Sequence, residues 1–284
     1  MTTPQWREPN GMGGAWGFDK HAVPPWLLVG TQSTKALLLD FAAGLVVRNV
    51  TPGVVTLSEG PPEGQSRWFM ITGNNPARGF IEVRDPQSQA LLARLEVKVK
   101  GKRPPLRIGF HFVQDKAGDK TTRSPDIVDS LIDELNSIYE PQTNLTFEMW
   151  GGGEVQINTS ADVVQKGWDA KTKSWTGEAR SLKSVWKEIV AKGDRGTDFN
   201  VFFVPARSYD DPLVLTQGNT CVIEDGVLQP AVLLPHEVGL FLGCPETSDF
   251  NLAHHLMFSF TQKSNVTPRN GNFIPKDCAN IMNP

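Results

Sequence analysis

The sequence has few cysteines, no long apolar run and no excess of either charge, and each absence excludes a class of protein. No stretch of about 18 apolar residues occurs, so the sequence predicts no transmembrane helix and no membrane insertion. The 28 Lys and Arg residues nearly balance the 31 Asp and Glu residues, and the formal net charge is -3. Since like charges form no block along the chain, the composition indicates neither nucleic acid nor an anionic membrane as a partner.

The cysteine count and the amino terminus bear on the compartment. Cys221, Cys244 and Cys278 are an odd number at irregular spacing, which is unlike a disulfide framework and typical of a reducing compartment. A lone cysteine such as Cys244 is able to bind zinc, but it is more often a small buried apolar side chain. Residues 1–20 contain no apolar run of the kind that a secretory signal needs. We therefore expect a cytoplasmic protein or one exported by a leaderless route.

The first hundred residues divide into two segments with different hydrophobic patterns. Residues 1–24 are rich in Gly, Pro and Trp without hydrophobic periodicity, and this predicts an extended arm. Residues 25–101 consist of short apolar or alternating runs with turn signals about every 10 residues, which is typical of an all-β sandwich. The runs are WLLVG, KALLLDF, LVVRNV, VVTLS, RWFMITG, GFIEVRD and ALLARLEVKVK. This segment resembles the immunoglobulin-like modules that precede catalytic domains in bacterial proteins.

The pattern after the linker KRPP is mixed α and β. Alternating apolar residues in LRIGFHF predict a strand, and Ser124 with Pro125 predicts the start of a helix. The run FNVFFV predicts a strand covered on both faces, and AVLLPHEVGLFLG predicts a helix that ends at Gly243. We therefore expect an α+β protein, with the sandwich at 25–101 followed by a mixed α/β domain at 105–284.

The segment beginning His236-Glu237-Val238-Gly239 carries the chemistry. Zinc peptidases use H-E-x-x-H because residues four apart on a helix share a face, so two imidazoles bind one metal. The Glu of that motif lies beside the metal-bound water and takes its proton. Metzincins extend the motif to H-E-x-x-H-x-x-G-x-x-H, with a methionine-containing turn further along the chain.

Residues 105–284 resemble the metzincin-type zinc metallopeptidases, with a damaged motif. His236, Glu237 and Gly243 stand where that pattern requires them, but Leu240 occupies the second ligand position and Glu246 the third. The resemblance implies that His236 binds zinc and that Glu237 is the general base. Leu240 has no lone pair to offer, whereas Glu246 is a chemically possible ligand. The sequence therefore predicts weak zinc binding or none.

Other residues near the motif complete the set that the resemblance implies. If a metal is held, either His254 or His255 is the natural substitute ligand, although one exposed and one hydrogen-bonded histidine is the simpler interpretation. Met257 and Met282 could each supply the methionine turn, and we favour Met282 because NIMNP has the composition of a tight turn. Residues 216–223, with Thr220, Cys221 and Val222 at their centre, lie where the family places a substrate-binding edge strand.

Three functions remain open at this stage. The chain is a metzincin-like zinc peptidase acting on a peptide or protein with an impaired metal site, or a pseudoprotease that binds extended peptides without cutting them. It is otherwise an inactivated variant of an active enzyme, although the second change at Glu246 favours natural divergence.

Overall fold

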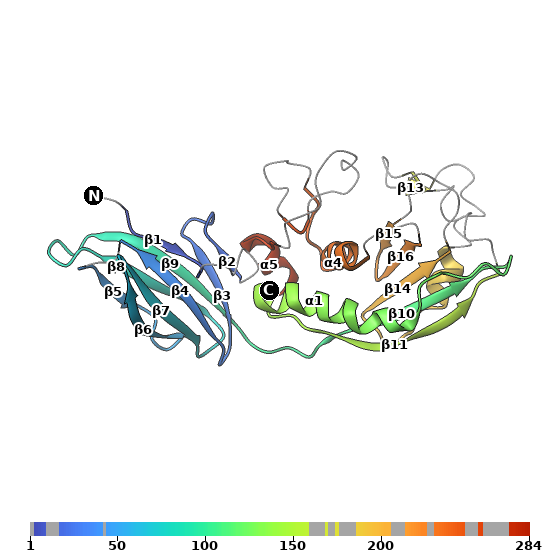
Figure 1. Cartoon of the computed structure of the whole chain (residues 1–284), viewed down its shortest axis with the longest axis horizontal. Helices are drawn as coiled ribbons and strands as arrows, with labels where there is room; N and C mark the ends of the chain where they lie inside the picture. Colours follow the sequence, from blue (N-terminus) through green and yellow to red (C-terminus); the bar gives the residue numbers. More distant parts are fainter. Residues whose placement is uncertain are drawn as a thin grey trace. The chain divides into compact units, whose positions relative to one another are not determined.

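The computed structural model describes residues 3–9, 17–41, 44–158, 168–169, 174–175, 186–205, 214–225, 230–247, 255–257 and 273–284. The fold is mixed α+β and consists mostly of sheets (Figure 1). The chain forms two compact units. Unit 1 comprises Met1–Pro104, Ser137–Thr146 and Cys244–Pro284, and unit 2 comprises Pro105–Asn136 and Phe147–Gly243.

Unit 1 contains two sheets built from the alternating runs. The four-stranded sheet has the order β1 (Gln5–Arg7), β4 (Thr34–Asp40), β7 (Ser66–Gly73), β6 (Val55–Glu63). The five-stranded sheet has the order β2 (Phe18–Asp19), β3 (Trp26–Gly30), β9 (Leu91–Lys100), β8 (Arg78–Arg84), β5 (Val46–Asn49). One cluster of buried side chains takes residues from both sheets, including Leu37 and Phe69 from the first and Val29 and Val97 from the second. The seven strands predicted over 25–101 are confirmed.

The predicted extended arm at 1–24 is wrong over the two stretches that form β1 and β2. Strand β1 pairs antiparallel with β4, and β2 pairs antiparallel with β3. Trp6 and Phe18 are only 5% and 4% exposed and belong to the shared core. Strands of three and two residues are too short to show alternation, so periodicity could not reveal them.

The carboxy-terminal segment of the chain joins unit 1. Helix α5 (Lys276–Met282) is attached to β9, because Lys276 Nζ donates to Glu96 Oε2 at 2.9 Å. Asn283 Nδ2 donates to the carbonyl of Thr143 at 2.6 Å, at the end of helix α1 (Val128–Thr143). The predicted domain 105–284 is thus divided between the two units, because these hydrogen bonds join residues far apart in sequence.

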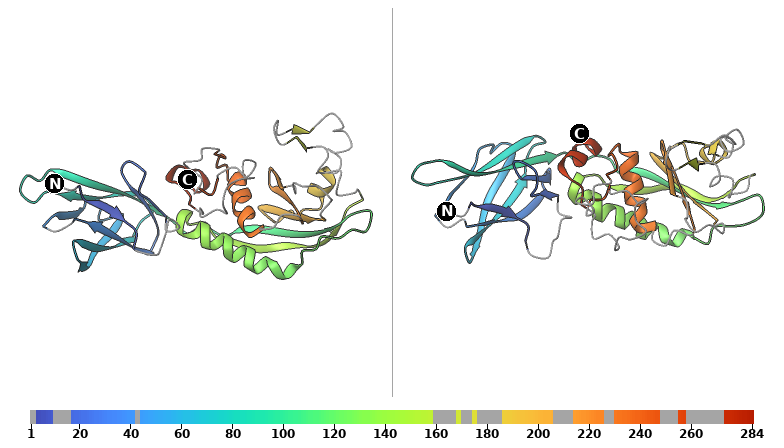
Figure 2. Two further views of the ribbon diagram at one scale, coloured as in Figure 1. Left: turned by 45° about the horizontal axis from the view of Figure 1, so that its top comes forward. Right: turned by 90° about the horizontal axis from the view of Figure 1, so that it is seen from above.

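Unit 2 is built on a five-stranded sheet. Its order is β11 (Phe147–Gln156), β10 (Leu106–Gln114), β14 (Phe199–Val204), β16 (Thr220–Glu224), β15 (Val214–Gln217). Strands β11, β10, β14 and β16 pair in parallel, and β15 pairs antiparallel with β16. A separate pair joins β12 (Trp168–Asp169) to β13 (Ser174–Trp175). Figure 2 shows the sheet with the first part of α1 running along it and helix α4 (Pro230–Phe241) near its β15 end.

The two faces of this sheet bury different side chains. One face packs Phe202, Leu215 and Val222 against Trp186 and Ile189, which belong to a helix at residues 186–191. On the other face Phe199 stacks on Phe241 of α4, with ring centroids 4.8 Å apart. All six residues of β14 are buried, which confirms the predicted strand covered on both faces.

The helix predicted after Ser124 is present, but it begins differently. A short 3-10 turn, η1 (Pro125–Ile127), precedes α1. The Ser124 side chain contacts the carboxylate of Asp126 and makes no hydrogen bond that caps the helix. Among the described residues no helix is long and apolar enough to cross a bilayer.

Candidate functional site

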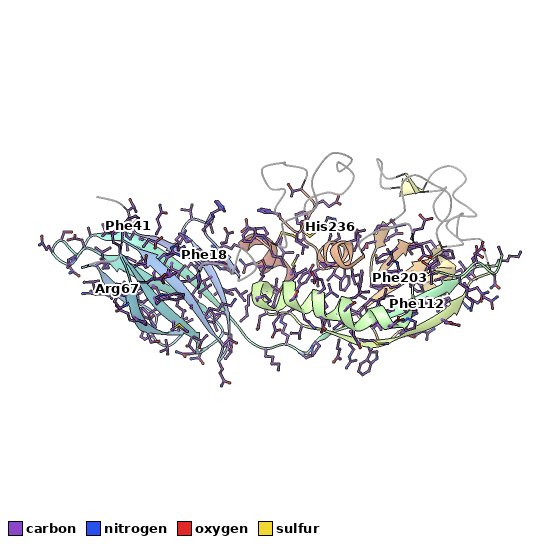
Figure 3. All side chains as sticks on the ribbon, in the orientation of Figure 1. Phe18, Phe41, Arg67, Phe112, Phe203 and His236 are labelled. Atoms are coloured by element: carbon purple, nitrogen blue, oxygen red, sulfur yellow. A yellow bond between two sulfur atoms is a disulfide. The ribbon has the colours of Figure 1, made fainter. Side chains whose placement is uncertain are left out.

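Helix α4 carries His236 and Glu237, the two residues of the predicted zinc motif. His236 is 1% exposed and Glu237 is 7% exposed, and both are near the middle of the helix. Figure 3 labels His236. The helix ends at Phe241, and Gly243 follows with φ +87 and donates its N–H to the carbonyl of Leu240 at 3.0 Å. A glycine adopts this left-handed conformation without steric cost, which explains the abrupt end of the helix.

The predicted edge strand is corrected by the pairing in unit 2. Thr220, Cys221 and Val222 lie in β16, which has β14 on one side and β15 on the other. All five residues of β16 are buried, so this strand offers no edge to a ligand. Among the described strands, the edge of the sheet on this side is β15, which begins at Val214.

A two-residue turn separates β15 from β16 and sets their hydrogen bonding. Gln217 pairs with Thr220 across Gly218 and Asn219, and Gly218 has φ +60. A turn of two residues makes the flanking pair a hydrogen-bonded one, and antiparallel pairs then alternate. The N–H of Leu215 therefore belongs to the ladder, and the N–H of Thr216 points away from β16. Glycine followed by asparagine between two apolar runs was a hairpin signal in the sequence, and it would have located the edge at β15.

Helix α4 lies against this edge strand. The two elements are in direct contact, and α4 makes its main contact with β15 among the strands. The Glu237 carboxylate is close enough to Cys221 to affect its thiol. Burial is the largest cause of the raised pKa of Cys221, and the negative charge of Glu237 adds to it. Because Cys221 lies in β16 and Glu237 lies on α4, Glu237 faces the hairpin of β15 and β16.

The ligand positions on α4 do not form a zinc site. Leu240 is half-buried and follows His236 by one helical turn, so a hydrocarbon occupies the place that a second imidazole needs. In the part of the chain that the structure describes, no group of three His, Cys, Asp or Glu side chains is placed to hold a metal ion. The described residues therefore do not fit a three-ligand catalytic zinc, and we derive no hydrolytic step.

The remaining predicted site residues belong to unit 1. Glu246 is half-buried shortly after Cys244. His255 forms an isolated bridge with Phe273, and the two rings lie 5.3 Å apart. Met282 is buried and is the last residue of α5, so it belongs to a helix and not to the predicted tight turn. His254 lies outside the described residues.

Cys244 is joined to Cys278 by a disulfide that the sequence did not predict. It links the residue after Gly243 to helix α5, across 34 positions of sequence. A disulfide sulfur is not a thiolate, so Cys244 is removed from the possible zinc ligands. The expectation of unpaired cysteines is wrong for this pair, whereas Cys221 is a free, buried thiol. The sequence could not predict this disulfide, because the spacing of three cysteines does not show which two of them meet in space.

A cavity of about 270 Å³ lies at the carboxyl ends of β10 and β11. Phe112 and Val155 contribute apolar walls, and Lys120, Arg123 and Glu154 contribute charges. None of the predicted site residues lines it. The opposing charges in its lining favour no single class of ligand.

Comparisons with known proteins give no family for this chain. No protein-family model and no characterised protein sequence matches it. Domains 1–6 of the surface layer protein SbsC are similar at 12% identity, covering 28% of this chain and 12% of that one, with a TM-score of 0.24. An endo-fucoidan hydrolase of glycoside hydrolase family 107 is similar at 12% identity, covering 31% of this chain and 15% of that one, with a TM-score of 0.21. The chain thus spans a small part of each, and similarity this low supports no argument about function.

Proposed function

We propose that the chain contains a metzincin-like peptidase-type domain that binds an extended peptide along β15 and has an impaired metal site. One observation carries the proposal: α4, which holds His236 and Glu237, lies directly against an antiparallel edge strand. An exposed edge binds a peptide by adding it as a further strand, with main-chain hydrogen bonds supplying the affinity. A peptide paired with β15 would run beside α4.

The metal site supports binding without cleavage. Leu240 replaces an imidazole, and Cys244 is held in a disulfide. A catalytic zinc in this class normally keeps three protein ligands. Of the three functions left open by the sequence, the peptide-binding pseudoprotease therefore has the most support.

We also propose that the two sheets of unit 1 form an immunoglobulin-like β-sandwich module. Their shared core and the alternation along β9 support this interpretation. Such a module would position or target the peptide-binding domain, an inference from architecture and not from a site.

Peptide binding can be tested with fluorescein-labelled casein, which is unfolded and offers many extended segments. We expect binding, seen as increased anisotropy, without release of acid-soluble fluorescence. Thr216→Pro should weaken binding by about 2- to 10-fold, since it removes one outward backbone donor. Thr216→Val keeps that donor and is the matched control. Equal binding by the two variants would exclude β15 as the binding edge, provided that urea unfolding shows both to be folded.

Zinc binding distinguishes the peptidase from the pseudoprotease. The unmodified protein should bind zinc weakly or not at all when purified without chelator and analysed by mass spectrometry. Leu240→His restores two imidazoles on one helical face and should raise zinc affinity by about 10- to 100-fold. Leu240→Gln has similar polarity without the imidazole and should give no such gain. Stoichiometric, tightly held zinc in the unmodified protein would refute the impaired site.

A further inference from the structure

The five-stranded sheet of unit 1 has one face toward the shared core and one face away from it, and the second face is covered in one half and charged in the other. Leu95, Val97 and Val99 of β9 point into the shared core, so the residues between them point outward. Over β3 the outward residues Trp26 and Leu28 are each 1% exposed, so that half is covered. Over β5, β8 and β9 the outward residues are mostly charged. We call this half the arginine face; its charged members are Arg48, Arg78, Arg84, Arg94, Lys98, Glu82 and Glu96.

Two buried carboxylates hold three guanidinium groups of the arginine face, those of Arg78, Arg84 and Arg94, in place. Glu82 is 4% exposed and pairs with Arg84 at 2.6 Å and with Arg94 at 2.5 Å. Glu96 is also 4% exposed, and it accepts one hydrogen bond from Arg78 Nη2 and one from Lys276 Nζ, each at 2.9 Å. Arg78 Nε lies 2.9 Å from the other oxygen of the same carboxylate. Each carboxylate is shared by two cations, so each group keeps a net positive charge.

The ring of Phe80 also holds the guanidinium groups of Arg78 and Arg94 in position. The guanidinium carbons of Arg78 and Arg94 lie 5.0 and 5.2 Å from the centre of its ring. Guanidinium planes stacked on an aromatic ring still present N–H groups along their edges. Arg78 and Arg94 remain 57% and 42% exposed, so these edges reach solvent. Side chains held in position before binding lose little conformational entropy when an anion arrives.

Two further cations complete the charge of the arginine face. Arg48 stands opposite Glu82 on the edge strand β5, and Lys98 stands opposite Arg78 on β9. Neither Arg48 nor Lys98 has an ion-pair partner among the described residues. They add positive charge that the two buried carboxylates do not offset.

We propose that the arginine face binds an acidic polypeptide segment in extended form, with carboxylates at alternate positions of the segment. The planar guanidinium of arginine can reach both oxygens of a carboxylate, and Arg78 Nη2 and Nε each lie 2.9 Å from an oxygen of Glu96. Outward residues recur every second position along β8 and β9, and an extended peptide repeats its side chains at the same spacing. Single-stranded nucleic acid fits less well, because it needs aromatic platforms for its bases and two guanidinium groups already lie over the Phe80 ring.

The test uses the full chain and a short fluorescein-labelled peptide of alternating Glu and Thr, followed by anisotropy at low ionic strength. A peptide with Gln in place of Glu is the ligand control. Arg48→Gln/Lys98→Gln should weaken binding by about 3- to 10-fold, as expected for the loss of two exposed charge pairs. Lys116→Gln/Lys192→Gln removes the same charge from exposed positions in unit 2 and should leave binding unchanged.

Arg94→Lys tests geometry apart from charge. It keeps the charge but loses the planar group, so binding should again weaken if aligned guanidiniums recognise the carboxylates. Several results would overturn the proposal: no binding of the Glu peptide, equal binding of the Gln peptide, or an equal loss in the Lys116→Gln/Lys192→Gln control. Tighter binding of phosphatidylserine vesicles or of an oligothymidylate at the same face would also overturn it, by assigning the face to a different partner.

Discussion

The two five-stranded sheets of this protein differ in how their strands are covered, and this difference determines how each can bind a ligand. Strands β8 and β9 bury one face and direct charged side chains outward, as at Glu82 and Arg94. Strands β14 and β16 are buried along their whole length. The first sheet can therefore bind through side chains on an open face. At β15 the second sheet can bind through the backbone of an edge strand, and the proposed peptide site lies there.

The largest expected effect is a loss of stability when proline is placed in an inner strand of unit 2 and not in its edge strand. Val222→Pro removes a backbone donor from β16, which is paired on both sides, and should destabilise the protein by on the order of 3 kcal/mol. Thr216→Pro on β15 should cost far less, because the donor that it removes points away from the ladder. Urea unfolding measures both changes. Similar losses for the two variants would mean that β15 is paired more extensively than the hairpin geometry indicates.

A smaller effect is expected at the open face of unit 1. Glu82→Gln removes a buried carboxylate that accepts hydrogen bonds from Arg94 and Arg84, and we expect a loss of about 1–3 kcal/mol at neutral pH. These hydrogen bonds, that of Arg94 first, lower the pKa of Glu82 below its ordinary 4.5. The carboxylate therefore stabilises the fold above pH 4.5, and this stabilisation is lost as pH falls through the lowered pKa.

The pH dependence gives the measurement that tests this prediction. Stability curves of the unmodified protein and of Glu82→Gln should be parallel above pH 5 and should converge below about pH 4. Arg48 stands opposite Glu82 but donates no hydrogen bond to it, so the variant Arg48→Gln serves as the control. A constant difference across the acid range would show that Glu82 acts through packing alone.

The smallest effect concerns a buried histidine in the sheet of unit 2. His111 is 2% exposed, bonds to Asn200 Oδ1 at 2.8 Å and stacks on Phe202. Burial lowers the pKa of His111, although the hydrogen bond with Asn200 and the charge of Asp194 oppose that change. Because the unfolded chain binds the proton more readily, stability should fall below pH 6.5, by at most about 1.4 kcal/mol per pH unit.

The matching variant is His111→Gln, which keeps a hydrogen-bonding group and does not titrate. Its stability should vary less between pH 6.5 and pH 5 than that of the unmodified protein, as measured by urea unfolding at each pH. An unchanged slope would mean that other groups carry the acid sensitivity of this unit.

Much of the fold followed from local pattern. Alternation at Leu95, Val97 and Val99 predicted β9, and the continuous apolar run predicted β14. The motif helix was placed to within two residues of its observed end at Phe241. Strands β1 and β2 were missed because they are too short to show a period, and the hairpin at Gly218 was missed because its turn signal lay inside a segment interpreted as one strand.

The candidate site was less predictable than the fold. The sequence identified His236, Glu237 and the loss of a ligand at Leu240, since these depend on spacing along one helix. It assigned the edge to Thr220, Cys221 and Val222, because strand order in a sheet is set by pairing between distant segments. It also missed the bridge from Cys244 to Cys278 for the same reason.

The sequence by itself determined which residues alternate, which helix carries the motif and which ligand is absent, because all of these are properties of neighbouring residues. Only the tertiary structure decided which strand is an edge, which cysteines meet and which charges share one face. Arg48, Arg84 and Arg94 come from three strands, and nothing in their spacing shows that they surround Glu82. Their assembly depends on sheet register, which is decided by the packing of the core on the opposite face.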